Sequence, residues 1–482
     1  MNAAHDLWAA TCLFAWISIL VLLHMMWSYQ SQTPLRLPLV GWVGLFLFEL
    51  LFSARFSWDV NTTRTELWIW TCTAAIFFLS CNIFHHDRSR HYFLCIGPFL
   101  LVPLSIDCLY QQLTRHALGT AGQFYLWGLH VTYGHWEING TLVNSVILAG
   151  FTLAWILVAY EQSQKNKYFY IPLCCGILIL LLARSWWSYF CLCLGLVYYH
   201  QDSALAFSRR HKILTRVIFT AATVISVFIL YFKFGPHQSD LYKGNDRWYW
   251  WATGVRMALE HPWTGIGLGG YSAAFPFFKF HAGQNTRYAH SFAIQILAET
   301  GIPGFICLGA LFAAFFYYFS TKKHRPSSPF SHERMALATV LMLICFSSIT
   351  LSMDYFLSKL MLVIFMGFAL AEIHVYEMRV TQRGILLITL AILLCIPSWE
   401  LPFRASQYTV NGLQQMNDPE SAEMSFKYAL SLDPYQTDSL SALSRLNAQL
   451  YAHSRSLLDW SYSILWFNEA SLLQKTTHET IH

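Results

Sequence analysis

Charged residues are scarce in this chain. Only 12% of its 482 residues are Asp, Glu, Lys or Arg, whereas a soluble globular protein carries roughly 25%. Hydrophobic residues make up 55% and aromatic residues 17% of the chain. This composition argues against a water-soluble domain and indicates a protein that crosses a membrane many times. No basic run with interleaved aromatic residues is present, so a nucleic-acid partner is not expected.

Motifs for metals and disulfides are also missing. The 12 cysteines lie in apolar stretches or at their edges, and no Cys-x-x-Cys pair occurs. Packing in an apolar interior is the favoured role for these cysteines, and a metal site or disulfide framework is the weaker alternative. The carboxylates Asp240, Asp246 and Glu260 are scattered rather than clustered, which does not suit Mg²⁺. We therefore expect no cofactor and no metal.

Long apolar runs recur along the chain. A backbone in hydrocarbon must satisfy its own polar groups, which favours helices, and the runs lack the alternation of barrel strands. The N-terminus has no basic segment of the kind that precedes a secretory signal, so the first run is expected to be a true span. We predict an all-α, polytopic membrane protein with about twelve transmembrane helices, at residues 7–27, 37–53, 67–84, 92–109, 142–160, 169–183, 185–200, 215–234, 301–319, 335–352, 355–374 and 384–399.

Lys and Arg gather in loops on one side of these spans, which identifies that side as cytoplasmic. The basic loops are 85–91, 162–167, 209–212, 322–325 and 379–383. The long loop 235–300 and the C-terminal tail then face the opposite side, as do the break at Arg184 and Asp354. We divide the chain into a transmembrane domain, residues 1–400, and a polar helical tail, residues 401–482. The side on which the N-terminus lies stays open.

The tail has the periodicity of short amphipathic helices. The run Ala422, Ala429, Leu430 and Asp433-Pro434 resembles the second helix of a tetratricopeptide repeat. Stacked repeats usually need three or more units. A small helical cap over the outer face is therefore favoured, and a docking module for a glycan or protein acceptor is the alternative.

The loop 235–300 carries most of the polar and aromatic motifs. Connectors are usually a few residues long, so a loop of this length is expected to be functional. A helix is predicted to begin at Arg247, capped by Asp246, and to end at Pro262. The glycines of Gly265-Ile266-Gly267-Leu268-Gly269-Gly270 do not follow a strand, so they are not a dinucleotide fingerprint. They form either a turn that presents N–H groups to a concave site or a simple re-entrant hairpin.

Two further residues attract attention. His290 precedes a predicted helix, Ser291 to Glu299, which Gly301 ends in a left-handed conformation. The positive end of the helix dipole favours a neutral imidazole there, and a neutral histidine is a suitable general base. Arg184 interrupts two apolar runs, and an arginine near a bilayer normally faces a cavity or a partner. A structural hydrogen bond for His290 and snorkelling of Arg184 to the interface are the alternatives.

Together these motifs resemble the O-antigen ligase and polymerase superfamily of bacterial membrane glycosyltransferases. The resemblance covers about residues 134–374 and rests on Arg247-x-x-x-Trp251, His261-Pro262-Trp263-Thr264-Gly265-Ile266-Gly267, His290 and Glu299-Thr300-Gly301-Ile302-Pro303-Gly304. Weaker matches are Asn144, Arg184 and Asp354. Two positions depart from the family: Ser291 follows His290 where the family has Asn, and Ala183 precedes Arg184 where the family has Ser. These departures bear on the acceptor rather than on the reaction.

The resemblance implies an inner-membrane enzyme that transfers a glycan from undecaprenyl diphosphate to a hydroxyl at the periplasmic face. The acceptor is lipid A-core, a growing glycan or a protein. His290 would be the base, and Arg184 and Arg247 would hold the diphosphate without a metal. Substrate contacts are expected from Trp251, Arg256, Gly267, Glu299 and Asn144. Trp248, Trp250, Trp251 and Tyr271 would stack on sugar rings or anchor the loop at the membrane interface.

Two other classes of protein remain as alternatives. A transporter for a lipid-linked glycan often shows inverted repeats and broken helices at the membrane midplane, and no internal symmetry is visible here. A non-catalytic membrane scaffold would depend on the C-terminal helical tail, so loss of all function on deletion after residue 404 would indicate that class.

Overall fold

The structure is a computed structural model, and it describes residues 2–118, 123–126, 129–132, 145–202, 247–280, 286–321, 330–350, 355–371, 375–434 and 437–454. Almost all of these residues are helical, so the predicted fold class is confirmed at that level. In the described ranges, strands form only two short antiparallel pairs: β1 (Leu35–Arg36) with β4 (Glu377–Met378), and β2 (Gln123–Leu126) with β3 (Leu129–Thr132).

The helices follow the apolar runs of the sequence. They are α1 (Asn2–Ser31), α2 (Val40–Ala54), α3 (Val60–Ile83), α4 (Asp87–Ile96), α5 (Leu101–Leu118), α6 (Ser145–Ser163), α7 (Tyr170–Ala183), α8 (Trp186–Tyr199), α11 (Arg247–Glu260), α12 (Tyr271–Phe278), α13 (Phe292–Thr321), α14 (Phe330–Ser347), α15 (Phe356–Leu370), α16 (Gln382–Gln414), α17 (Pro419–Leu432) and α18 (Thr437–Ser454). Most expected spans fall on one helix. The span 92–109 instead covers parts of α4 and α5, and 215–234 lies outside the described residues.

Several helices have the length and composition of membrane spans. Within the described residues, four segments meet both criteria: Thr62–Ile83, Asp87–Leu113, Ser145–Ser163 and Phe292–Thr321. Shorter apolar helices include α2 and α15. The length and apolar composition of these helices indicate a membrane protein, while the total of about twelve spans stays a prediction.

The helix α6 forms the buried centre of the bundle. Its residues Leu148, Leu153 and Leu157 are completely or almost completely inaccessible to solvent, and the helix packs against α7, α14 and α15. This placement explains why α6 is apolar around its whole circumference rather than along one stripe.

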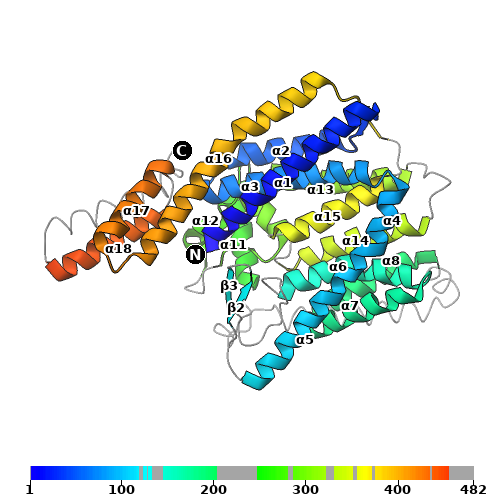
Figure 1. The fold of residues 1–482 in the computed structure, drawn as a ribbon, viewed down its shortest axis with the longest axis horizontal. Coiled ribbons are helices and arrows are strands. Elements are labelled where there is room, and N and C mark those ends of the chain that lie inside the picture. Colours follow the sequence, from blue (N-terminus) through cyan, green and yellow to red (C-terminus); the bar gives the residue numbers. More distant parts are fainter. Residues whose placement is uncertain are drawn as a thin grey trace.

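The polar elements gather at one end of the bundle. Figure 1 shows α11, α12, α17 and α18 at that end, and α16 running beside α1 toward it. The tail helices pack on each other through Ala422, Phe426, Leu443 and Leu446. The described residues of the tail are helical and share an end with the loop. The division of the chain into two domains and the kinship with tetratricopeptide repeats stay predictions.

The helix α13 is broken at Gly301, as the sequence predicted. Gly301 has φ 67° and ψ −166°, a region that is essentially restricted to glycine. The positive φ was expected, but the left-handed helical conformation was the wrong prediction, because ψ is extended. The break separates a short helix at the end of the polar loop from the apolar helix that follows.

Candidate functional site

Arg247 and the helix that follows Arg184 both contact the end of α14. Arg247 begins α11, and its Nη1 donates a hydrogen bond to the carbonyl oxygen of Ile349, 3.3 Å away, just after α14. One turn earlier, the carbonyl oxygen of Cys345 accepts from Nε1 of Trp187, at 3.1 Å. Arg184 lies three residues before Trp187, is exposed, and ends α7 with φ 50°. The starts of α8 and α11 therefore meet at the same end of α14.

His290 lies beside Arg247 on the loop that enters α13. Its imidazole stacks on the indole of Trp250, with ring centroids 4.5 Å apart and 28° between the planes. Burial first, and the positive charge of Arg247 second, lower the pKa of His290 from its usual 6.5 to about 4. Its Nδ1 is buried with no hydrogen-bond partner in the described part of the chain. The neutral imidazole was expected, but its cause is burial rather than mainly the helix dipole.

A chain of hydrogen bonds positions this histidine. The N–H of Ala289 donates to Oε1 of Gln295 at 2.7 Å, and Nε2 of Gln295 donates to Oε1 of Glu299 at 2.6 Å. The buried Glu299 carboxyl also accepts from the N–H of Gly269. Glu299 thus joins the glycine loop to the segment of His290. The part played by Gln295 carried no signal in the sequence beyond its place one helical turn before Glu299.

The glycine loop packs against the turn between α2 and α3. Gly267 has φ 82°, and a Cβ on it would lie 2.1 Å from Cα of Ser57. The carbonyl oxygen of Leu268 accepts from Oγ of Ser57 at 3.1 Å and from Oγ1 of Thr63 at 2.6 Å. The close approach of the two backbones explains why glycine is needed at this point of the loop. Contact of Gly267 with substrate stays a prediction.

The remaining loop residues have varied surroundings. Arg256 donates from Nε to Oε1 of Glu260 at 2.7 Å and from Nη1 to the carbonyl oxygen of Phe278 at 3.2 Å, which ties α11 to the end of α12. Trp251 is half-buried on α11. Tyr271 is fully buried and donates its hydroxyl to the carbonyl oxygen of Trp250 at 2.8 Å. The expected stacking of Tyr271 on a sugar is therefore wrong, because the α11–α12 packing encloses its ring.

Three candidate residues, Asn144, Asp246 and Asp354, lie outside the described residues. The part of the chain that the structure describes contains no group of three or more His, Cys, Asp or Glu side chains arranged to hold a metal ion. Roles in substrate binding for Trp251, Arg256, Glu299 and Asn144 stay predictions, as do the catalytic roles of His290, Arg247 and Arg184.

A comparison with known families bears on the same segment of the chain. The family described as O-antigen ligase matches residues 146–309, a segment that contains Arg184, Arg247, His290 and Glu299. The resemblance inferred from the loop motifs is thereby confirmed, over a shorter segment than the expected 134–374. It supports a membrane glycosyltransferase of the O-antigen ligase and polymerase kind. No curated protein matches the chain.

Proposed function

We propose that this protein transfers a glycan from undecaprenyl diphosphate to an acceptor hydroxyl at the periplasmic face of the bacterial inner membrane. One observation carries the proposal. His290 is neutral and half-buried, with a buried Nδ1 that has no hydrogen-bond partner in the described part of the chain and with the Arg247 charge beside it. It lies inside the segment that matches the O-antigen ligase family. A neutral imidazole is ready to accept a proton, and a guanidinium is suited to a phosphate.

The reaction is a single displacement. The acceptor oxygen forms a bond to the anomeric carbon, and its proton passes to His290. The bond from that carbon to the diphosphate oxygen breaks, and undecaprenyl diphosphate leaves with the electron pair. Attack opposite the leaving group inverts the configuration at the anomeric carbon. Arg247 and Arg184 are assigned to the growing charge on the diphosphate, where charge-assisted hydrogen bonds lower the barrier.

Substitution tests these assignments. His290→Ala is expected to lower the rate of glycan transfer by about 10²–10⁴-fold, the usual contribution of a general base, and Arg247→Ala is expected to abolish detectable transfer. His91→Ala and Arg404→Ala are matched controls, since both side chains are exposed and lie outside the matched segment. Full transfer by either site variant would remove its assigned role. Movement of the lipid-linked glycan without any new glycosidic bond would instead indicate a transporter.

Three acceptors fit the same chemistry. Transfer to lipid A-core would make the protein an O-antigen ligase, and transfer to a growing chain or to a protein would make it a polymerase or a protein O-oligosaccharyltransferase. The docking of the tail favours a growing chain or a protein as the acceptor. Arg64 at the start of α3 pairs with the buried Asp433 after α17, with Nη1 3.2 Å from Oδ1, so the tail is held beside the loop. A glycan profile of a deletion strain separates the three, by loss of long lipopolysaccharide chains, of a polymer or of a glycoprotein.

A further inference from the structure

A polar cavity of about 190 Å³ lies next to the His290 segment, with Tyr288 and Phe292 among the residues that line it. It is enclosed by the start of α3, the beginning of α12, the first turns of α13, the start of α15 and residues 287–288. Its volume is well above the roughly 10–15 Å³ that one water needs by the same measure. The cavity therefore has room for a ligand about the size of one sugar ring.

The charges around the cavity do not suit a diphosphate. Its carboxyl groups belong to Asp59, Glu66 and Glu299, and its cations to Arg287 and Lys359. Glu66 accepts a hydrogen bond from the buried Nζ of Lys359 at 2.9 Å, so that cation is already compensated. A phosphate group would meet more carboxyl groups than cations. An uncharged ligand can instead donate hydrogen bonds from its hydroxyl groups to these carboxyl oxygens.

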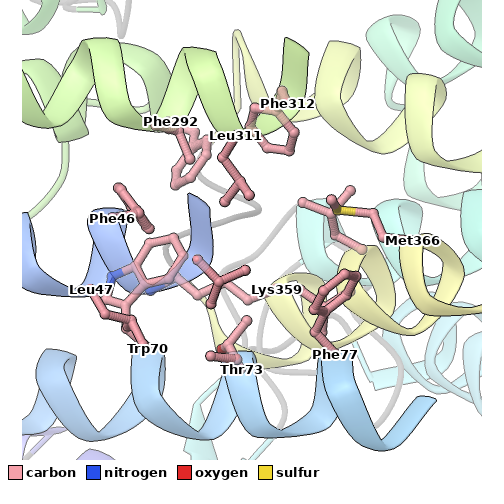
Figure 2. Close-up of a pocket in the computed structure, with 15 residues that line it drawn as sticks. Phe46, Leu47, Trp70, Thr73, Phe77, Phe292, Leu311, Phe312, Lys359 and Met366 are labelled. Atoms are coloured by element: carbon pink, nitrogen blue, oxygen red, sulfur yellow. The ribbon is translucent and has the colours of Figure 1, made fainter. Parts of the chain in front are cut away.

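The floor of the cavity is aromatic. Trp70 of α3 stacks on Phe292 of α13, with centroids 6.0 Å apart and 28° between the planes. Nζ of Lys359 lies 4.7 Å from the centroid of the Trp70 ring. Beneath these three residues is a small apolar pocket of about 60 Å³ between α2, α3, α13 and α15, which Figure 2 shows with its lining side chains. Aromatic side chains at the floor and carboxyl oxygens around the sides match the apolar carbons and the hydroxyl groups of a sugar ring.

We infer that this cavity binds one neutral sugar residue of the glycan substrate, an inference that rests on the proposed function. Tyr288 and Phe292 line the cavity and lie two residues on either side of His290, whose ring faces Trp250. A sugar bound here is therefore held next to the catalytic segment. Thr62, Glu66 and Lys359 lie outside the segment 146–309 that matches the family, so part of the cavity wall comes from residues that the family match does not cover.

Blocking the mouth of the cavity tests the inference. Ser272 lines the cavity and is exposed, and Ser272→Trp fills the opening without disturbing a buried residue. Phe277→Trp is the matched control, because Phe277 is exposed on the same helix and does not line the cavity. Tyr288→Leu removes one aromatic wall without adding bulk. We expect Ser272→Trp to raise KM at least tenfold for one substrate, with kcat within about twofold. A higher KM for the lipid-linked donor assigns the sugar to the donor, and a higher KM for the acceptor assigns it to the acceptor.

A binding measurement separates this inference from the transfer mechanism. Saturation-transfer NMR on the purified full chain would use the methyl glycosides of glucose, galactose and N-acetylglucosamine, with inorganic pyrophosphate as competitor. At least one glycoside is expected to bind to the wild type, to Phe277→Trp and to His290→Ala, and pyrophosphate should not displace it. Its signal should fall at least fivefold in Ser272→Trp and in Tyr288→Leu. Equal signals and equal KM values in Ser272→Trp and the wild type would contradict a sugar site in the cavity. The absence of any glycoside binding to the wild type would contradict it as well. Full transfer by His290→Ala would overturn only the mechanism.

Discussion

The imidazole of His290 lies nearly parallel to the indole of Trp250, with ring centroids 4.5 Å apart. The stack matters because His290 has φ 55°, and such a conformation costs a residue other than glycine about 1–3 kcal/mol. The hydrogen bond from Ala289 to Gln295 holds the backbone before it. Trp250 holds the ring itself, so the direction of the histidine nitrogens depends on an aromatic neighbour.

Removing that neighbour is expected to slow the reaction more than it weakens binding. An aromatic stack contributes about 0.5–1.5 kcal/mol, so Trp250→Ala should lower kcat about tenfold and leave KM within about threefold. Trp250→Phe keeps a ring and should recover most of the rate. Leu259→Ala is the matched control, since Leu259 is an exposed residue of the same helix to which no role is assigned. Equal rates for Trp250→Ala and Leu259→Ala in a transfer assay would show that the stack has no role in catalysis.

The pH dependence of the reaction follows from the state of His290. A base acts in its deprotonated form, so activity is lost as the pH falls through its pKa, which is about 4 in the free protein. The acid limb of kcat/KM is therefore expected near pH 4. Bound diphosphate would offset the charge of Arg247 and raise the pKa, so the acid limb of kcat should lie at higher pH.

Arg247→Gln tests the cause of this shift. The substitution removes the positive charge that helps to lower the pKa of His290, so the pKa should rise even though transfer is lost. NMR titration of the histidine ring in the purified variant measures the change directly. A pKa that stays near 4 in Arg247→Gln would show that burial alone accounts for the neutral imidazole.

The helices and the break in α13 were predictable because their signals are local. Long apolar runs mark most of the spans, Pro262 follows the end of α11, and Gly301 marks the kink. Each of these features depends on a few neighbouring residues in the chain. The family motifs added His290 and Arg247, which the structure brings close enough for the charge of one to shift the pKa of the other.

The partners of the site residues were not predictable, because they come from distant segments. Lys359 pairs with Glu66, which lies 293 positions away in the sequence. No local sequence pattern around either residue predicts this pair. Tyr271 was expected to face a sugar because it is an aromatic residue in a polar loop. It is buried because residues of α11, α12 and α13 form a small hydrophobic core together with Trp58 and Ile266, a property of packing rather than of composition.

Gly267 is expected to be essential for the fold of the loop. Gly267 has φ 82°, and a Cβ at this position would collide with the backbone of Ser57. Gly267→Ala should therefore destabilise the protein by about 2–5 kcal/mol, from the positive φ and the overpacking together. Gly309→Ala is the control. Nothing lies within 4 Å of a Cβ at Gly309 in α13, and alanine in a helix is favoured by about 0.5–1 kcal/mol. Thermal unfolding in detergent compares the two, and equal midpoints would contradict the packing of the glycine loop.

The ion pair between Arg64 and Asp433 is expected to hold the tail against the membrane domain. The side chain of Asp433 is 2% exposed and that of Arg64 34% exposed, so Arg64→Ala removes this cation from beside a buried carboxylate. Breaking a buried pair costs about 3–5 kcal/mol, and the partial exposure of Arg64 places this case at the lower end. Limited proteolysis should therefore release the tail from Arg64→Ala faster than from the wild type.

The control for the tail is an ion pair of similar length at the surface. Nη2 of Arg404 lies 2.6 Å from Oε1 of Glu400 on α16, and both side chains are exposed. Such a pair contributes about 0–1 kcal/mol, so Arg404→Ala should leave proteolysis unchanged. If the tail of Arg64→Ala is cleaved no faster than that of Arg404→Ala, the buried pair does not fasten the tail. If it is cleaved faster while glycan transfer falls only for a polymeric or protein acceptor, the docked tail serves that acceptor.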